Sequence, residues 1–240
     1  ISRYLKSLVL LAAAVAVGSA SGDSIGRSPG AVGPFLNGIF PTKAPGPGGN
    51  WALVDAFPHL TFVDPVRMVP DPRAADHVFV VCRSGEIWRV PFSPQAKKEE
   101  KQKVLDLRTV TLGFGDSGMM SLAFHPDFGV PQNPNRGYVY VFYQYVPQQP
   151  EDTDPATPSY LRLSRFLIPD GESVIDPASE LVMIQQFDRH AWHTGGGMFF
   201  GPDRYLYLSL GDEGGSKDFY RSGQKINERL FAGILRIDVD

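Results

Sequence analysis

His193 is the residue whose type and neighbours best suit proton-transfer chemistry. It is followed by Thr194 and by a run of glycines that begins at Gly195. An imidazole titrates near neutral pH, so it can accept a proton from a substrate hydroxyl group. The small residues leave the ring uncrowded and allow a flat ligand to approach the backbone. His193 is therefore the candidate general base, and the alternative is a histidine with only a structural role.

Two carboxylates follow the same region of the chain. Asp212 and Asp218 lie in the glycine-rich stretch of residues 211–218. Oxygen ligands are those that calcium prefers, so both residues are candidate calcium ligands, although their spacing departs from an EF-hand loop. The alternative is a turn with solvated acidic side chains.

Residues 113–118 have the Gly-x-Gly-x-x-Gly spacing of a dinucleotide-binding loop. In such a loop the glycines open a helix, whereas here they precede strand-like sequence, so no NAD site is predicted. Asp116 lies within this stretch. Asp116 precedes the first strand of its repeat, as His193 precedes the first strand of the next repeat. Both side chains are therefore expected at the mouth of one central channel.

A threefold pattern of strands must position these residues. In each copy an apolar strand leads to Pro-Asp, an alternating aliphatic and aromatic strand follows, and a third strand carries Arg. One such sheet cannot bury both faces, whereas sheets stacked radially as propeller blades can. The sequence thus predicts an all-β propeller, with a β-sandwich as the alternative. The predicted segments are residues 66–69, 77–81 and 86–90 in the first copy, 120–127, 138–142 and 162–166 in the second, and 197–203, 205–208 and 235–237 in the third; the segments 120–127 and 197–203 include the Pro-Asp turn.

The composition supports a globular β protein. The 240 residues include 42% hydrophobic residues, 25 Gly and 21 Pro, which suit a core with many tight turns. The net charge of -3 gives no attraction to nucleic acid or to an anionic membrane. Cys82 is the only cysteine and stands in an apolar strand, so it is predicted to fill space in the core.

The N-terminal part resembles a targeting segment. Residues 1–20 combine a basic start, an apolar run and small residues, as in a secretory signal, and residues 21–50 form a Pro/Gly-rich linker. The propeller domain is then expected over residues 51–240. These features predict a secreted or periplasmic protein without stable membrane insertion; a retained N-terminal anchor is the alternative. The first residue is Ile and the last strand has no following turn, so a longer protein is expected.

Several motifs together resemble the soluble glucose and sorbosone dehydrogenase family, the pyrroloquinoline-quinone-dependent aldose sugar dehydrogenases. They lie in residues 118–128, 176–180, 193–212 and 233–238, and the resemblance covers about residues 62–240. It implies a six-bladed β-propeller, of which this chain holds roughly the first half. It also implies two cofactors, the quinone and calcium.

The resemblance implies a role for His193 in particular. The family's histidine removes the proton from the anomeric hydroxyl of a sugar while hydride passes to the quinone, and the product is a lactone. Electrons would then pass to an external acceptor. By the same resemblance, Asp116, His193 and Gly195 are the candidate cofactor-binding residues.

Two positions depart from the family pattern. Asp116 stands where the sugar dehydrogenases commonly have Gln, and Trp192 stands where the glucose enzymes have an acid. A carboxylate beside an anionic quinone is costly unless it is protonated or a cation bridges the two. The same propeller resembles the extracellular domain of hedgehog-interacting proteins, so a secreted scaffold that binds protein or carbohydrate is the alternative function.

Overall fold

The computed structural model describes residues 53–152, 154, 156–225 and 227–240, and strands dominate this part of the chain. The predicted signal sequence and linker lie outside it. All the strands belong to one unit, which includes Phe57–Asp240. Two short 3-10 helices, η2 (Lys98–Glu100) and η3 (Ser222–Gln224), interrupt the loops. Within these ranges no helix has the length and apolar character needed to span a membrane.

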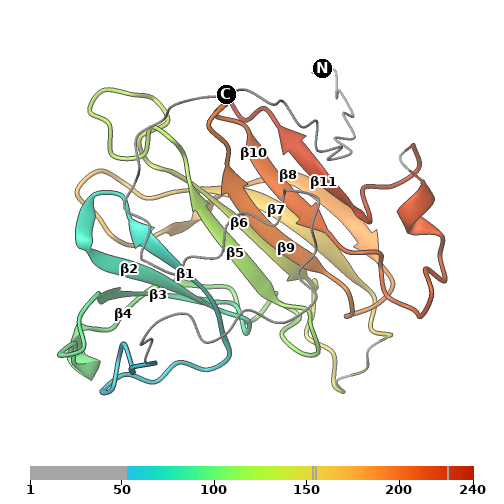
Figure 1. The fold of residues 1–240 in the computed structure, drawn as a ribbon, viewed down its shortest axis with the longest axis horizontal. Helices are drawn as coiled ribbons and strands as arrows, with labels where there is room; N and C mark the ends of the chain where they lie inside the picture. Colours follow the sequence, from blue (N-terminus) through green and yellow to red (C-terminus); the bar gives the residue numbers. More distant parts are fainter. Residues whose placement is uncertain (1–52, 153, 155, 226) are drawn as a thin grey trace, which may run out of the picture. The chain divides into compact units, whose positions relative to one another are not determined.

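The strands form three antiparallel sheets that follow one another along the chain (Figure 1). The first sheet contains β1 (Pro65–Asp71), β2 (Ala74–Cys82), β3 (Glu86–Pro91) and β4 (Gln102–Asp106). The second contains β5 (Met119–Phe124), β6 (Tyr138–Tyr145), β7 (Ser159–Leu167) and β8 (Asp176–Asp188). The third contains β9 (Gly195–Phe200), β10 (Leu206–Leu210) and β11 (Gly233–Ile237). The three predicted strand copies are confirmed.

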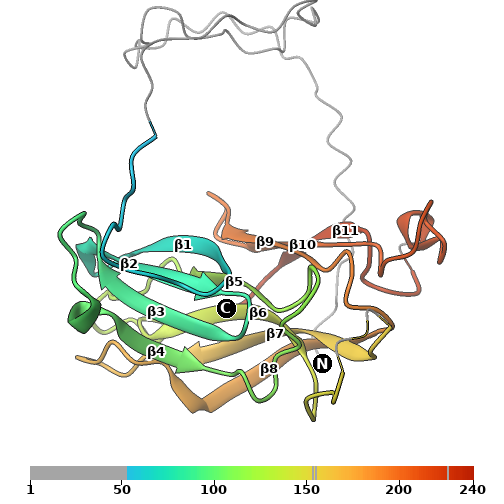
Figure 2. The same cartoon turned by 90° about the horizontal axis from the view of Figure 1, so that it is seen from below.

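The first strands of the three sheets lie next to one another. Strand β5 contacts both β1 and β9, as Figures 1 and 2 show. Arg67 on β1 also donates a hydrogen bond to the carbonyl oxygen of Met198 on β9, at 2.6 Å. Sheets that meet through their first strands are consecutive blades of a β-propeller, rather than the two stacked layers of a sandwich.

Aromatic side chains fill the two spaces between neighbouring sheets. Phe79 of the first sheet meets Phe124 of the second edge to face, with ring centroids 5.0 Å apart. Tyr140 of the second sheet meets Phe200 of the third in the same way, at 5.5 Å. Such pairs combine a large buried area with a favourable ring geometry. Strand β6 and the second half of β2 are therefore buried on both sides, which explains their continuous apolar sequences, whereas buried and half-buried residues alternate along β10.

The repeated Asp and Arg residues have a structural reason. In the first sheet Arg89 Nε lies 2.8 Å from Asp71 Oδ2, and in the third Arg236 Nε lies 2.9 Å from Asp203 Oδ2. The Asp of each Pro-Asp turn is thus tied to the Arg of the third strand. The second sheet departs from this pattern, because its Asp127 pairs with an arginine of the third sheet.

The outer strands β4 and β8 were not among the predicted strands. The stretch of residues 95–103 is rich in charged side chains, yet its last two residues begin β4. Outer strands are half exposed and lack a continuous apolar run, so their sequences resemble loops. The expected role of Cys82 is confirmed: its side chain is fully buried, and burial raises the pKa of its thiol to about 11.

Candidate functional site

The hairpin of β9 and β10 brings the two ends of the candidate site together. The strands run antiparallel with Gly195 opposite Leu210, and Gly211 N donates a hydrogen bond to Thr194 O at 3.2 Å. The residues just before β9 therefore lie beside those just after β10. This register places His193 against Asp212, although 19 positions separate them in the sequence.

The His193 side chain is held at one ring nitrogen only. Its Nδ1 lies 2.6 Å from Asp212 Oδ1. A carboxylate only accepts hydrogen bonds, so the proton of the neutral ring resides on Nδ1 and the lone pair on Nε2. No partner of Nε2 occurs among the described residues, and the side chain is 49% exposed. The imidazole thus presents a basic nitrogen to solvent in a fixed orientation.

The backbone of His193 is fixed as well. Its φ of 58° lies in the left-handed region, which costs energy for a residue with a Cβ. Its N–H donates to Asp116 Oδ2 at 2.7 Å, so the expected proximity of Asp116 and His193 is confirmed. A Cβ atom on Gly211 would lie 1.4 Å from His193 O, and only glycine fits there.

Gly195 and Gly196 are explained by packing within the hairpin. Their φ angles are +80° and +111°, which favour glycine. A Cβ on Gly195 would lie 2.7 Å from Gly211 N, and one on Gly196 would lie 2.5 Å from Cβ of Met120. These glycines let neighbouring segments of the same chain approach closely. The expected contact of Gly195 with a cofactor stays a prediction.

A buried polar network supports the chain next to His193. Thr194 Oγ1 donates to Gln144 Oε1 at 2.9 Å, and Gln144 Nε2 donates to Asp188 Oδ2 at 3.2 Å. His190 N donates to the other Asp188 oxygen at 3.1 Å. Burial raises the pKa of Asp188 to about 7, and the nearby charge of Glu213 adds to the effect.

Sequence reasoning missed this network and the role of Asp212 as partner of His193. Gln144 was the available signal for the network, because it is a lone amide in the apolar strand β6. A buried amide needs partners, so it marks a place where polar groups meet. Asp212 could have been paired with His193 from the hairpin alone, once β9 and β10 were aligned.

The two candidate calcium ligands, Asp212 and Asp218, contact different residues. Asp212 is engaged by His193, and Asp218 Oδ1 accepts a hydrogen bond from Gly223 N at 3.2 Å. Over the described ranges, no three His, Cys, Asp or Glu residues are grouped to hold a metal ion. Calcium binding by Asp212 or Asp218 therefore stays a prediction.

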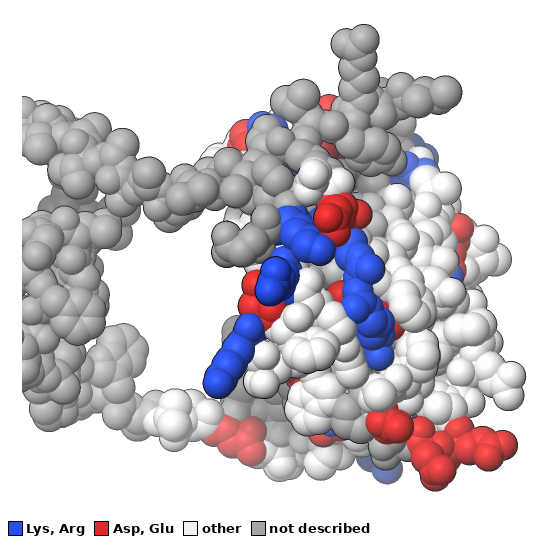
Figure 3. Space-filling model, turned by 90° about the vertical axis from the view of Figure 1, so that its right-hand side faces the viewer, with Lys and Arg blue, Asp and Glu red and all other residues white. Residues whose placement is uncertain are grey.

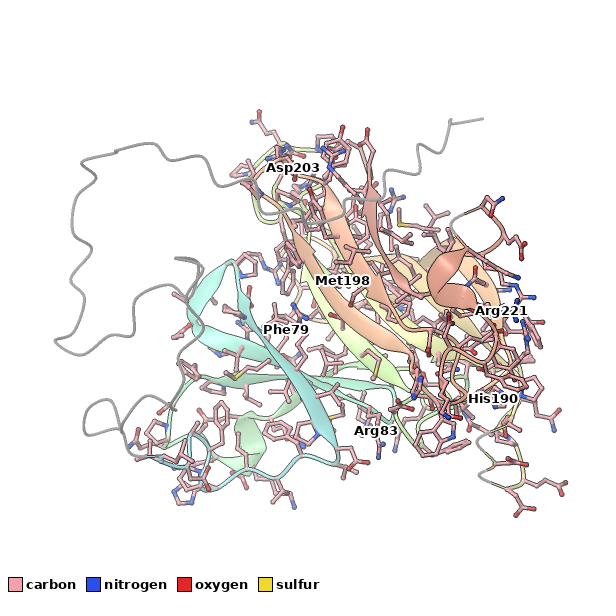
Figure 4. All side chains as sticks on the ribbon, turned by 45° about the vertical axis from the view of Figure 1, so that its right-hand side comes forward. Phe79, Arg83, His190, Met198, Asp203 and Arg221 are labelled. Atoms are coloured by element: carbon pink, nitrogen blue, oxygen red, sulfur yellow. The ribbon has the colours of Figure 1, made fainter. Side chains whose placement is uncertain are left out.

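The site lies at one end of the third sheet. Figure 4 places His190 at this end, Met198 along the sheet and Asp203 at the opposite end. Two large apolar side chains of the adjoining loops face solvent here: Trp192 is 43% exposed and Phe219 is 71% exposed. The region around His193 therefore combines an oriented base with exposed aromatic rings.

Comparisons with known proteins give one family match and two kinds of relative. The family model described as Glucose / Sorbosone dehydrogenase matches residues 64–240. Hedgehog-interacting protein of Mus musculus is 26% identical over 179 residues, which make up 73% of this chain and 24% of that protein. Quinoprotein glucose dehydrogenase B of Acinetobacter calcoaceticus is 26% identical over 100 residues, 42% of this chain and 19% of that protein. The chain thus spans about a quarter or less of these relatives.

Solved structures share the fold. A putative oxidoreductase (glucose dehydrogenase) from Thermus thermophilus matches with a TM-score of 0.51 at 21% identity, over 73% of this chain and 44% of that one. Another glucose dehydrogenase gives a TM-score of 0.54 at 15% identity, over 74% and 44%. The predicted fold class is confirmed: the chain is all-β and forms roughly half of a six-bladed β-propeller.

Proposed function

Because the chain belongs to the glucose/sorbosone dehydrogenase family, we propose that it takes part in oxidising an aldose sugar at the anomeric carbon to a lactone. The observation that carries this proposal is the pairing of His193 with Asp212, which leaves Nε2 free and accessible. A fixed base with an exposed lone pair is what removal of a hydroxyl proton requires.

In the proposed reaction, His193 Nε2 accepts the proton of the anomeric hydroxyl group. The ring then carries a positive charge, which the Asp212 carboxylate at Nδ1 stabilises. Asp116 holds the backbone N–H of His193 and so keeps the ring in position. Trp192, the residue before His193, provides exposed apolar surface next to the base.

Pyrroloquinoline quinone and calcium are the proposed cofactors, with Asp116, His193 and Gly195 as cofactor-binding residues. When bound, the quinone supplies the acceptor for the hydride that leaves the anomeric carbon, and an external acceptor reoxidises it. The donor set fits this group when a cation accompanies it: Asp116 Oδ1 is buried without a hydrogen-bond partner among the described residues. Calcium would offset the negative charges of Asp116 and of the quinone. Asp212 and Asp218 are further candidate ligands.

The experiment that tests this proposal is reconstitution of the full protein. Quinone and calcium are added, and dye reduction is measured with a panel of aldoses. Turnover that depends on the quinone and yields a lactone supports the proposal. Absence of quinone binding and of turnover in folded protein would contradict it.

The second candidate function is a binding scaffold without catalysis. The match to a hedgehog-interacting protein favours it, and so does the exposure of Trp192 and Phe219. Exposed aromatic side chains suit a binding surface as well as an active site. Under this alternative the protein recognises a protein or carbohydrate through the same face, and substitution of His193 weakens binding without changing any turnover.

We also propose that the protein is secreted or periplasmic, as the basic and apolar residues of positions 1–20 suggest. N-terminal sequencing of protein from the extracellular or periplasmic fraction tests this, with a mature terminus near Ser21 as the expected result. Protein found only in the cytoplasm with its first 20 residues intact would contradict it.

A further inference from the structure

We propose that a basic pocket beside the candidate site binds a small oxyanion, that is, a ligand carrying a phosphate or carboxylate group. The pocket has a volume of about 230 Å³. Figure 3 shows Lys and Arg side chains gathered on the face of the molecule where η3 lies. The residues that line the basic pocket are Arg189, Tyr220, Ser222, Lys225, Glu228 and Arg229.

The two arginines of the basic pocket are fixed in advance by one buried carboxylate. Glu213 is fully buried, with Arg189 Nε at 3.0 Å and Arg229 Nη1 at 3.0 Å from its oxygens. A guanidinium group has five N–H donors, so each arginine keeps donors for a further partner. Arg189 and Arg229 retain exposed side-chain surface of 32% and 45%. A ligand therefore meets donors whose orientation is already set.

The charges around the basic pocket are not balanced. Arg189, Lys225 and Arg229 contribute three positive charges, whereas Glu228 in the lining and Glu213 beneath it contribute two negative ones. Lys225 Nζ lies 2.9 Å from Glu228 Oε2 in a solvent-exposed pair, which is weak and easily exchanged. The side chains around the basic pocket therefore carry a net charge of about +1, which favours a negatively charged ligand. Guanidinium groups bind planar or tetrahedral oxyanions through paired hydrogen bonds.

A chain of side-chain contacts connects the basic pocket to the loop that carries His193. Arg189 stacks on the Tyr220 ring at 4.1 Å, and the Tyr220 hydroxyl lies 2.6 Å from His190 Nε2. His190 in turn precedes His193 in the loop after β8, and Glu213 follows Asp212 directly. An anion held by Arg189 would therefore rest against the two loops that carry the candidate base and its partner. Neither residue of that pair is itself part of the pocket.

The direct test is calorimetric titration of the full protein with inorganic phosphate and with succinate, each against chloride at equal ionic strength. Saturable binding of phosphate or succinate is expected, and the stronger ligand identifies the phosphate or carboxylate class. Lys225→Gln should weaken binding about tenfold, because it removes one charge-assisted contact. Glu228→Gln should strengthen it several-fold, because it removes the internal competitor of the ligand. Both variants leave the buried Glu213 with its two arginines, so both should fold.

Two further variants show whether the anion binds in the basic pocket. Arg229→Gln should weaken binding more than Lys225→Gln, while His193→Ala should bind the anion as the unaltered protein does. No binding beyond chloride, or equal affinities for the Lys225 and Glu228 variants, would overturn the proposal. The titration needs neither quinone nor turnover, so its failure is distinct from failure of the dehydrogenase proposal.

Discussion

Nδ1 of His193 lies 2.6 Å from Oδ1 of Asp212, and this contact joins the start of β9 to the end of β10. It fixes both the direction of the imidazole and the nitrogen that carries its proton. The chemistry proposed for the site depends on this contact, because a rotated ring or the other tautomer would no longer present a basic Nε2.

Asp212→Asn is expected to lower kcat by roughly 100-fold or more, because an amide donates to Nδ1 and favours the tautomer with the proton on Nε2. The variant should fold normally, since the Asn side chain has the same size. Steady-state kinetics and the pH profile of kcat/KM provide the measurement. Asp218→Asn is the control, and an equal loss in both variants would indicate a shared metal site instead.

Gly211→Ala is expected to disrupt the site through sterics alone. The new Cβ would lie 1.4 Å from His193 O, so the loop must move and the protein is destabilised. Gly233→Ala is a matched control on the neighbouring strand, because its Cβ would meet no atom closer than 3.8 Å. Thermal unfolding should give a melting temperature several degrees lower for the first variant only. Equal melting temperatures would refute this packing argument.

Asp188 is expected to make stability depend on pH. Burial raises its pKa from 3.8 to about 7, so the folded state holds a proton that the unfolded state loses at lower pH. The free energy of unfolding should therefore fall as pH rises from about 4 to about 7. Each pKa unit corresponds to about 1.4 kcal/mol, which gives an upper limit of about 4 kcal/mol.

Denaturant unfolding of Asp188→Asn against the unaltered protein measures this contribution. The neutral amide does not titrate, so the variant should gain stability relative to the unaltered protein across the same pH window. A difference in stability that stays constant from pH 4 to 8 would show that Asp188 titrates normally.

Cys82 is expected to resist alkylation in the folded protein. Its side chain is fully buried and burial raises the pKa of its thiol to about 11, so little reactive thiolate exists at neutral pH. Mass spectrometry of peptides after iodoacetamide treatment should find Cys82 unmodified under native conditions and modified in denaturant. Rapid modification of native protein would place it at the surface.

The sequence was sufficient to predict the blades but not the contacts between them. The three strand copies were predictable because middle strands such as β6 are buried on both faces and carry long apolar runs. The outer strands β4 and β8 were not, because half-exposed strands resemble loops. The pairing of His193 with Asp212 was missed, although an alignment of β9 with β10 would have implied it.

The network of Gln144 and Asp188 could not be predicted in the same way. Gln144 lies on β6 and Asp188 ends β8, and no local pattern reports which buried polar groups of these strands meet across the sheet. The proximity of Asp116 and His193 was expected, but not the hydrogen bond from His193 N to Asp116 Oδ2, which joins loops of different sheets 77 positions apart. Such contacts depend on how the sheets pack, which periodicity alone does not specify.

The most direct test of the proposed function is dye-linked oxidation of aldoses by the full protein with quinone and calcium, measured beside His193→Ala. We expect turnover that requires the quinone and falls by roughly 100-fold or more in the variant, as for loss of a general base. Quinone binding measured in the same variant separates loss of catalysis from loss of the cofactor. Turnover that is unchanged in His193→Ala, or absent from the folded and quinone-loaded unaltered protein, would contradict the proposed role of His193.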